Sequence, residues 1–445
     1  MPGVKFRRKN RVLRNFRSER CEWFVRIFDD IYPRNLPVLR IRDAHRRCHR
    51  SMRSVIRLSG KAATLIAADT LTKSPPVTDT VSSIPASRRV CALGLLTAAI
   101  AVLAGGAAAS AAPLRPALRR VGEIAVPGRA LRKFDIGFVN AAGIYAFSDK
   151  SNQGLDLIDA ATGRFLGRAG GFGHDGPKGV VAVGTGTFWA SDGDSGTVKV
   201  VDVRTRRIIA SILTERGKTT DELTYDPRDH LVAVVAKHDG PPILNLISTR
   251  SRKVVGRVTL TAATDGAEQP AYVPATGLLY LSLPVLHHVK AEGAIAVINP
   301  RTRRLVKLIQ VRQCMPAGLA LGPHSDLLVG CSDDAVTAGF PAHSLILDAR
   351  TDRIVARIAQ VGGSDEVYAD PRAHRYYLAA VKNPGGPVLG IVDARTRRWI
   401  ANLPSGPDAH SVAADPRSGK VFVPMAASRD GGPCREGCVA VFAPR

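Results

Sequence analysis

The sequence is poor in aromatic residues and lacks the short motifs of the common nucleotide-binding and catalytic folds. Aromatic residues make up 5% of the 445 residues and only three are Trp, which argues against a surface that stacks nucleic-acid bases. No GxxxxGK[ST] phosphate loop, GxSxG nucleophile elbow, HExxH zinc helix or CxxCH haem motif occurs. One GxGxxG match, at 171–176, precedes an apolar strand pattern and no helix, so dinucleotide binding is not expected.

Negative charge is also scarce. Asp and Glu number 38 against 63 Lys and Arg, which gives a formal net charge of +25. Residues 1–89 hold 21 of the bases but only 7 of the acids, so more than half of the excess lies in a fifth of the chain. That part has no sustained hydrophobic period and no recognition-helix pattern. We interpret residues 1–87 as a basic, disordered extension and expect no specific nucleic-acid binding.

A charge-free run follows two arginines at 88–89. Its apolar core at 92–103 leads to Ala109, Ser110 and Ala111, the small residues that signal peptidase requires. Residues 88–112 are therefore predicted to be a signal peptide, and the mature protein is expected in the periplasm or outside the cell.

The position of this segment, far from residue 1, leaves two interpretations open. In the first, translation begins just upstream of the signal, for example at Val81, and residues 1–87 are not part of the protein. In the second, residues 90–114 stay uncleaved and anchor the chain in the membrane, with the basic extension in the cytoplasm. We favour cleavage, and we expect contact with a membrane only in the second case.

Cysteine is rare beyond the predicted signal, where four remain. An even number in an exported chain favours disulfides. Cys314 and Cys331 flank a strand–turn–strand unit and are predicted to pair across it. Cys434 and Cys438 are predicted to close a small loop before the last strand. A metal site is the alternative, but the spacing is not CxxC.

One pattern recurs through residues 113–445: an apolar strand, Asp or a substitute for it, a basic turn and a second apolar strand. Its landmark residues are Asp159, Asp202, Ser248, Asn299, Asp348, Asp393 and Ala443. Four strands in each interval of 43–51 residues are typical of a propeller blade. We predict an all-β, seven-bladed β-propeller over 113–445. The strand at 121–126 is expected to pair with the last blade and close the ring, which leaves no free sheet edge and favours a monomer.

The repeat has an I-D-x-x-T-x-[RK]-[VI] turn and a DP-x-x-x-x-[VL]-[YFV]-V hairpin. In both it resembles the YVTN-type β-propeller repeat proteins of bacteria, which are related in shape to the lactonase-like and haem d1 propellers. The resemblance covers about 125–445. It implies an exported or surface-located seven-bladed propeller and specifies no reaction, because members of the family bind varied ligands.

Blade topology predicts that the turns between third and fourth strands gather on one face. They are basic, with residues such as Arg204, Arg250 and Arg301. These arginines are typical solvated turn residues of the repeat; alternatively, they form a face that docks on anionic envelope polymers. Trp189 and Trp399 fit the strand patterns and are expected to pack between blades.

The opposite face is predicted to collect acids and histidines at the mouth of the central channel. The candidate ligand or metal residues are Asp175, Asp221, Glu222, Glu268, Asp365, Glu366 and His410. The loops between second and third strands add Asp149, Asp192, Asp194, His238, Asp239, His287, His288, Asp333 and Asp334. Crowded carboxylates repel one another, and a divalent cation (Ca²⁺, Mg²⁺ or Zn²⁺) would relieve the repulsion. The alternative is a purely structural role, in which the acids cap loops and strand ends.

Two functions follow, and we favour the first. The chain is an exported binding or scaffold module of the cell envelope that holds a small molecule, protein or polymer at the propeller mouth. Alternatively, it is a metal-dependent hydrolase of lactonase type, with a carboxylate or His as the base; no individual catalytic residue is predicted.

Overall fold

The computed structural model describes residues 118–215, 219–237, 240–428 and 434–445. The predicted basic extension (1–87) and signal peptide (88–112) lie outside these residues. In the described part of the chain, no helix has the length and apolar character needed to cross a membrane.

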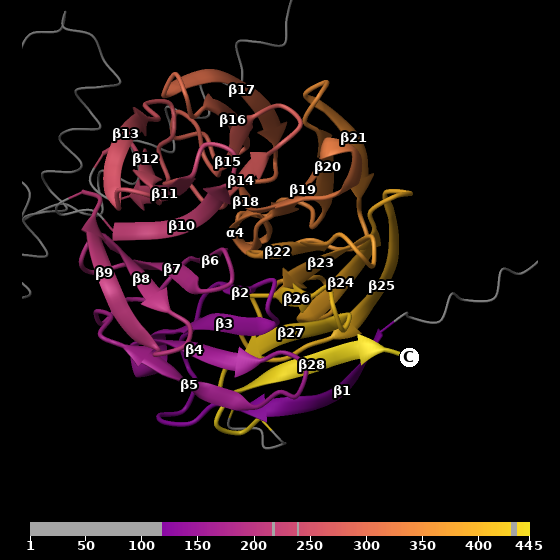
Figure 1. Cartoon of the computed structure of the whole chain (residues 1–445). Helices are drawn as coiled ribbons and strands as arrows, with labels where there is room; N and C mark the ends of the chain where they lie inside the picture. Colours follow the sequence, from indigo (N-terminus) through magenta and orange to yellow (C-terminus); the bar gives the residue numbers. More distant parts are fainter. Residues whose placement is uncertain (1–117, 216–218, 238–239, 429–433) are drawn as a thin grey trace, which may run out of the picture. The chain divides into compact units, whose positions relative to one another are not determined.

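The described residues form seven antiparallel sheets of four strands each, and the sheets are arranged in a ring around a central axis (Figure 1). The predicted all-β, seven-bladed propeller is therefore confirmed. The first three blades contain β2 (Gly137–Val139), β3 (Ile144–Asp149), β4 (Gly154–Asp159) and β5 (Phe165–Gly170); β6 (Val180–Val183), β7 (Thr187–Asp192), β8 (Thr197–Asp202) and β9 (Arg207–Leu213); and β10 (Thr219–Asp226), β11 (Leu231–Lys237), β12 (Ile243–Ser248) and β13 (Lys253–Thr259).

The next three blades follow the same order from the channel outward. They contain β14 (Pro270–Val273), β15 (Leu278–Leu283), β16 (Glu292–Asn299) and β17 (Arg304–Arg312); β18 (Pro316–Leu321), β19 (Asp326–Cys331), β20 (Ser344–Asp348) and β21 (Arg353–Ile358); and β22 (Val367–Asp370), β23 (Arg375–Ala380), β24 (Val388–Asp393) and β25 (Arg398–Pro404). The short helices are η1 (Lys150–Asn152), η2 (Pro323–Ser325) and α4 (Asp333–Thr337).

The seventh blade combines strands from both ends of the repeat region. It contains β26 (Ala413–Asp415), β27 (Lys420–Met425), β28 (Cys438–Pro444) and, as its outer strand, β1 (Leu118–Ala125). β1 runs antiparallel to β28, with Leu118 opposite Pro444 and Ala125 opposite Cys438. The strand expected at 121–126 thus begins and ends slightly earlier, and its partner is the expected one.

The recurring Asp-x-x-Thr sequence forms the turn between the third and fourth strands. The Asp202 carboxylate accepts hydrogen bonds from the Thr205 N–H and hydroxyl group, both at 2.7 Å. Arg206 then adopts a left-handed φ of 58°, and its N–H donates to the Asp202 carbonyl group. The register of β8 and β9 shifts between Val200 and Val201, directly before this turn. The repeat signature is therefore a capped turn with a bulge, a conformation that these residue types favour.

The hydrophobic core lies between blades. Seven clusters of buried side chains each join two neighbouring sheets, including the last with the first, where Tyr145 stacks on Phe422. Trp189 packs between the second and third blades, as expected. The same expectation for Trp399 is wrong. Its side chain is 39% exposed because β25 is an outer strand, and its indole N–H donates to Asn402 beside it.

Both predicted disulfides are present. Cys314 pairs with Cys331, and the bond connects the segment before β18 to the end of β19. Cys434 pairs with Cys438, the first residue of β28. Each disulfide links two nearby segments of the same blade.

Candidate ligand site at the channel mouth

The segment leading into the innermost strand of each blade places one residue at an equivalent position around the channel. In four blades a backbone hydrogen bond defines this position. The carbonyl group of the residue that follows it accepts an N–H of the second strand. These acceptors are Ile136, Gly179, Gln269 and Glu366. In β10 and β18 the position coincides with a register shift against the second strand. The seven equivalent residues, here called the mouth ring, are Asp135, Lys178, Asp221, Glu268, Ala317, Asp365 and His410.

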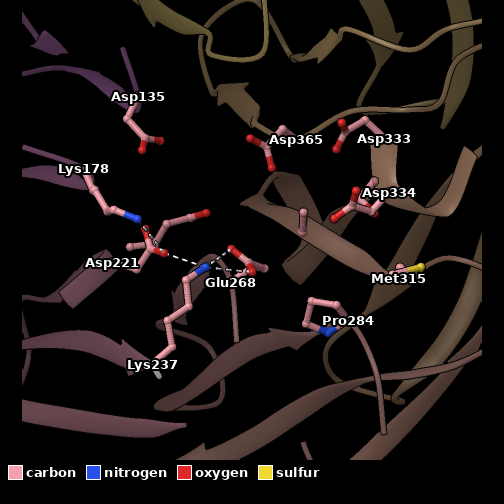
Figure 2. A pocket seen from close by; sticks show the side chains of 13 residues that line it. Asp135, Lys178, Asp221, Lys237, Glu268, Pro284, Met315, Asp333, Asp334 and Asp365 are labelled. Atoms are coloured by element: carbon pink, nitrogen blue, oxygen red, sulfur yellow. Dashed lines mark hydrogen bonds and ion pairs between the residues drawn. The ribbon is translucent and has the colours of Figure 1, made fainter. Parts of the chain in front are cut away.

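Six residues of the mouth ring, all except His410, line one cavity of about 280 Å³. The side chains around it are shown in Figure 2. Glu222, Lys237, Asp333 and Asp334 also line it. Seven carboxyl groups and two ammonium groups thus surround the cavity, and carboxyl groups are in clear excess.

Lysine side chains occupy one side of the cavity (Figure 2). The Lys237 ammonium group, at the end of β11, lies 2.6 Å from the Asp221 carboxylate and 3.1 Å from that of Glu268. Lys178 lies 3.7 Å from Asp221. Burial alone would raise the pKa of Asp221, but these two cations outweigh it and lower the pKa to about 2. Asp221 is therefore ionised at every physiological pH.

For two other carboxyl groups of the cavity, burial outweighs the nearby positive charge. Burial raises the pKa of Asp365 to about 6, although the positive charge of His410 opposes the shift. Burial raises the pKa of Glu268 to about 7, even with Lys237 beside it. Near neutral pH these groups hold protons part of the time, because the crowded site disfavours further negative charge.

Two glutamates lie one position further along the chain than Asp221 and Asp365. Glu222 and Glu366 are 4% and 2% exposed. Burial raises the pKa of both well above the usual range, and neighbouring carboxylates add to the shift. The Gln269 amide donates to Glu366 at 3.5 Å, whereas Glu222 Oε2 has no hydrogen-bond partner among the described residues. With its pKa raised, Glu222 holds a proton, so this buried carboxyl group offers both a donor and an acceptor to a ligand.

His410 is held as a cation. Its Nδ1 lies 2.7 Å from the Asp408 carbonyl oxygen and its Nε2 lies 3.2 Å from that of Phe134, so both ring nitrogens face acceptors and donate. The ring also stacks on the Phe134 side chain. Burial alone would lower the pKa of His410, but the contacts with Asp408 and Asp365 raise it to about 9. To coordinate a metal, this side chain would first have to give up one of its hydrogen bonds.

The structure brings most of the candidate residues together. Asp221, Glu222, Glu268 and Asp365 line the cavity, as do Asp333 and Asp334. Glu366 is buried beside Gln269. Asp175 does not line the cavity, and its side chain is 50% exposed near Lys178.

The other loop candidates lie elsewhere or have structural roles. Asp149 accepts hydrogen bonds from the Asn152 N–H and from Arg168, and Asp192 accepts from Gly173, Ser195 and Lys199. Asp194 accepts the Asp175 N–H. His287 and His288 are exposed, and His238 and Asp239 lie outside the described residues. Loop capping, the structural alternative, therefore holds for several of these acids.

Sequence reasoning missed Asp135, Lys178 and Lys237. In GPKGVV, Lys178 stands before an apolar segment, as Asp221 and Asp365 do in their blades. An alignment of the segments that begin each blade would therefore have shown that Lys178 occupies the same position. Lys237 ends a second strand, and only the spatial proximity of neighbouring blades shows that it reaches Asp221.

The described mouth residues do not form a ready cluster of metal ligands. In the described part of the chain, the one group of three His, Cys, Asp or Glu ligand atoms within 4.8 Å of one another is Cys314, Cys331 and His343, and its sulfurs form a disulfide. The cation predicted from the sequence would therefore have to draw the mouth carboxylates closer together.

These features define the class of the protein, a seven-bladed β-propeller with an acidic channel mouth. Comparison with solved structures finds hydrazine synthase of Kuenenia stuttgartiensis, with a TM-score of 0.55 and 14% sequence identity, over 68% of this chain and 96% of that one. At this identity the similarity shows the fold alone. No family model and no curated protein matches the chain, so membership in the YVTN-type family stays a prediction.

Proposed function

We propose that this chain is an exported binding propeller of the YVTN type, located in the cell envelope, whose mouth holds a small organic cation. The observation that carries the proposal is the excess of carboxyl groups around the cavity, seven against two ammonium groups. A bound cation would stabilise the ionised forms of Asp365 and Glu268, whose pKa values are raised to about 6 and 7.

The site already accommodates a primary ammonium group. Lys237 places its Nζ between Asp221 and Glu268, at distances typical of charge-assisted hydrogen bonds. Asp365, Asp333 and Asp334 lie apart from that contact and offer further carboxylates (Figure 2). A diamine or a guanidinium compound matches this chemistry, since its N–H donors can reach several carboxylates at once and also the unpartnered oxygen of Glu222.

A hydrolase of lactonase type gains no specific support. It needs a metal held by several ligand atoms, and the mouth carboxylates do not converge in that way within the described residues. A divalent cation is retained as a competitor in the binding test.

The proposal is tested by isothermal titration calorimetry of the full chain with 1,4-diaminobutane, and separately with Ca²⁺, Mg²⁺ and Zn²⁺. We expect Asp365→Asn to weaken diamine binding by about tenfold, the effect of losing one charged contact. Binding should also release protons, measured as a dependence of the heat on the buffer, because the carboxyl groups ionise when the cation arrives.

The matched control is Asp229→Asn. It removes one carboxylate from the turn between β10 and β11, where Asp229 pairs with Arg301 away from the mouth. The diamine affinity should change less than twofold. No diamine binding, or equal weakening by both variants, would contradict the proposal. Tight binding of a metal ion without diamine binding would favour the metal alternative.

A further inference from the structure

A second cavity lies beside the first and has the opposite charge. Its volume is about 310 Å³, and it is lined by Arg129, Ala130, Arg132, Lys133, Lys150, Ser151, Gln153 and His174. No carboxylate lines it. The residues come from the segment between β1 and β2, from the loop that contains η1, and from the approach to β6.

The cationic groups of this cavity are largely uncompensated. Lys150 forms an ion pair with Asp135, at 2.5 Å. Arg129, Arg132 and Lys133 form no side-chain ion pair within the described residues, and all three are exposed. Three unpaired positive charges around one cavity attract a multivalent anion.

The segment that carries these three residues is fixed by side chains of the first blade. Ser151 Oγ accepts the N–H groups of Arg132 and Lys133, at 2.9 and 2.8 Å, and the Ser151 N–H donates to the Lys133 carbonyl group. Asn152 accepts the Arg129 N–H at 2.7 Å and donates to its carbonyl group at 3.1 Å. Two residues of η1, Ser151 and Asn152, thus fix the backbone of this segment at two places, Lys133 and Arg129.

Two further contacts hold the approach to this segment. Arg168 donates to the Pro127 carbonyl group at 2.9 Å. Gly128 has a φ of 118°, and a Cβ atom there would lie 2.4 Å from the Asn152 carboxamide oxygen. The segment can therefore lie against η1 only with glycine at this position. The backbone that carries its basic residues is thus positioned before any ligand arrives, which lowers the entropic cost of binding.

We propose that this basic cavity, lined by Arg129, Arg132, Lys133 and Lys150, is a binding site for a phosphate group. Two guanidinium groups offer paired N–H donors that match phosphate oxygens, and lysine adds a point charge. A single carboxylate would neutralise only one of the three unpaired cations, whereas a diphosphate or phosphomonoester neutralises more. The inference stands on this cavity alone and does not depend on the cation site of the mouth.

The test uses the full chain with pyrophosphate as the probe, measured by isothermal titration calorimetry at constant ionic strength. The double variant Arg132→Glu/Lys133→Glu should weaken binding at least tenfold. The matched control, Arg204→Glu/Arg250→Glu, makes the same change of charge in two turns at the other ends of the strands. It should change the affinity less than twofold, and circular dichroism should show both variants folded.

A second pair of variants separates a built site from diffuse positive charge. Ser151→Ala keeps every charge but removes the hydroxyl that positions Arg132 and Lys133, so it should weaken pyrophosphate binding severalfold. Ser151→Thr keeps the hydroxyl and should restore the affinity. If Ser151→Ala binds like the wild type, or if the two charge-reversal variants weaken binding equally, the proposed site is wrong.

The phosphate group could belong to a soluble compound or to a lipid headgroup, and vesicles distinguish the two. Phosphatidylglycerol vesicles, compared with phosphatidylcholine vesicles, test the lipid source in a co-sedimentation assay. Sensitivity to Arg132→Glu/Lys133→Glu with both pyrophosphate and vesicles supports a site for either source, and sensitivity with vesicles alone supports a headgroup site. Failure of wild-type protein to bind either probe overturns the proposal.

Discussion

At the scale of single residues, burial makes the ionised forms of several mouth carboxyl groups unfavourable. The folded-state pKa of Asp365, about 6, lies above the value near 4 of an unfolded chain. Such a group contributes stability below the unfolded pKa and loses that contribution as the pH rises through about 6. At pH values above about 6, the ionised Asp365 carboxylate therefore lowers the free energy of unfolding.

We predict that Asp365→Asn is more stable than the wild type at pH 8, on the order of 1–2 kcal/mol after allowance for partial solvent screening. The difference should vanish near pH 4, where the wild-type carboxyl group is protonated. Urea unfolding at both pH values measures it.

The same measurement on Asp229→Asn serves as a control of opposite sign. Arg301 lowers the pKa of Asp229, so this carboxylate contributes stability above the unfolded pKa and loses it as the pH falls. Its replacement should cost stability at pH 8. A loss of stability in Asp365→Asn at pH 8 would show that the attraction between Asp365 and His410 outweighs the cost of burial.

At the residue scale, the sequence indicated which acids lie together at the mouth but not which positive charges lie beside them. Asp221 and Glu268 were found because the acidic blade entries repeat. The positive charges of Lys237 and His410 depend on distances between blades, which no local pattern encodes. His410, a candidate ligand from the sequence, directs both ring nitrogens at backbone carbonyl groups.

At the scale of secondary-structure elements, the sequence determined the fold because each turn carries its own signal. The carboxylate of Asp393 accepts the Thr396 N–H in the sixth blade as Asp159 accepts the Thr162 N–H in the first, so the same short motif marks the same turn in both blades. The exposure of Trp399 was missed because an outer strand has the same apolar pattern as an inner one, and only its neighbours differ.

The segments that lead into the innermost strands of neighbouring blades also approach each other closely, and Gly179 permits this. A Cβ atom at Gly179 would lie 2.8 Å from Glu222 Cα and 2.9 Å from the Asp221 carbonyl oxygen. We predict that Gly179→Ala destabilises the protein by about 1–3 kcal/mol, the usual cost of overpacking. Because the clash displaces Asp221 and Glu222, diamine binding should weaken as well.

Gly186→Ala is the matched control, since a Cβ atom there meets nothing within 4 Å. It should change the unfolding free energy by less than about 0.5 kcal/mol, as is usual for surface positions. Equal effects of the two substitutions would show that the contact between blade entries is not tight.

At the scale of the whole molecule, we expect the pairing of β1 with β28 to close the ring. Removal of β1 would expose the edge of β28 and would take the buried side chains of Leu118 and Ile124 out of the core. We predict that deletion of residues 1–125 lowers the melting temperature by about 10 °C or more and promotes aggregation. Differential scanning calorimetry and light scattering measure both effects.

Deletion of residues 1–117, which leaves β1 in place, is the comparison. It should melt at nearly the temperature of the full chain. If the two deletions behave alike, the outer strand of the seventh blade is dispensable, and closure depends on the contacts between the first and last sheets.

The mouth ring has a further consequence for anything bound on the channel axis. Seven equivalent positions carry Asp, Lys, Asp, Glu, Ala, Asp and His. The backbone repeats its geometry around the axis, but the chemistry does not repeat. A ring of identical residues would accept one molecule in as many equivalent orientations as there are blades. Here the order of side chains around the ring does not repeat, so an asymmetric molecule has a single preferred rotational setting.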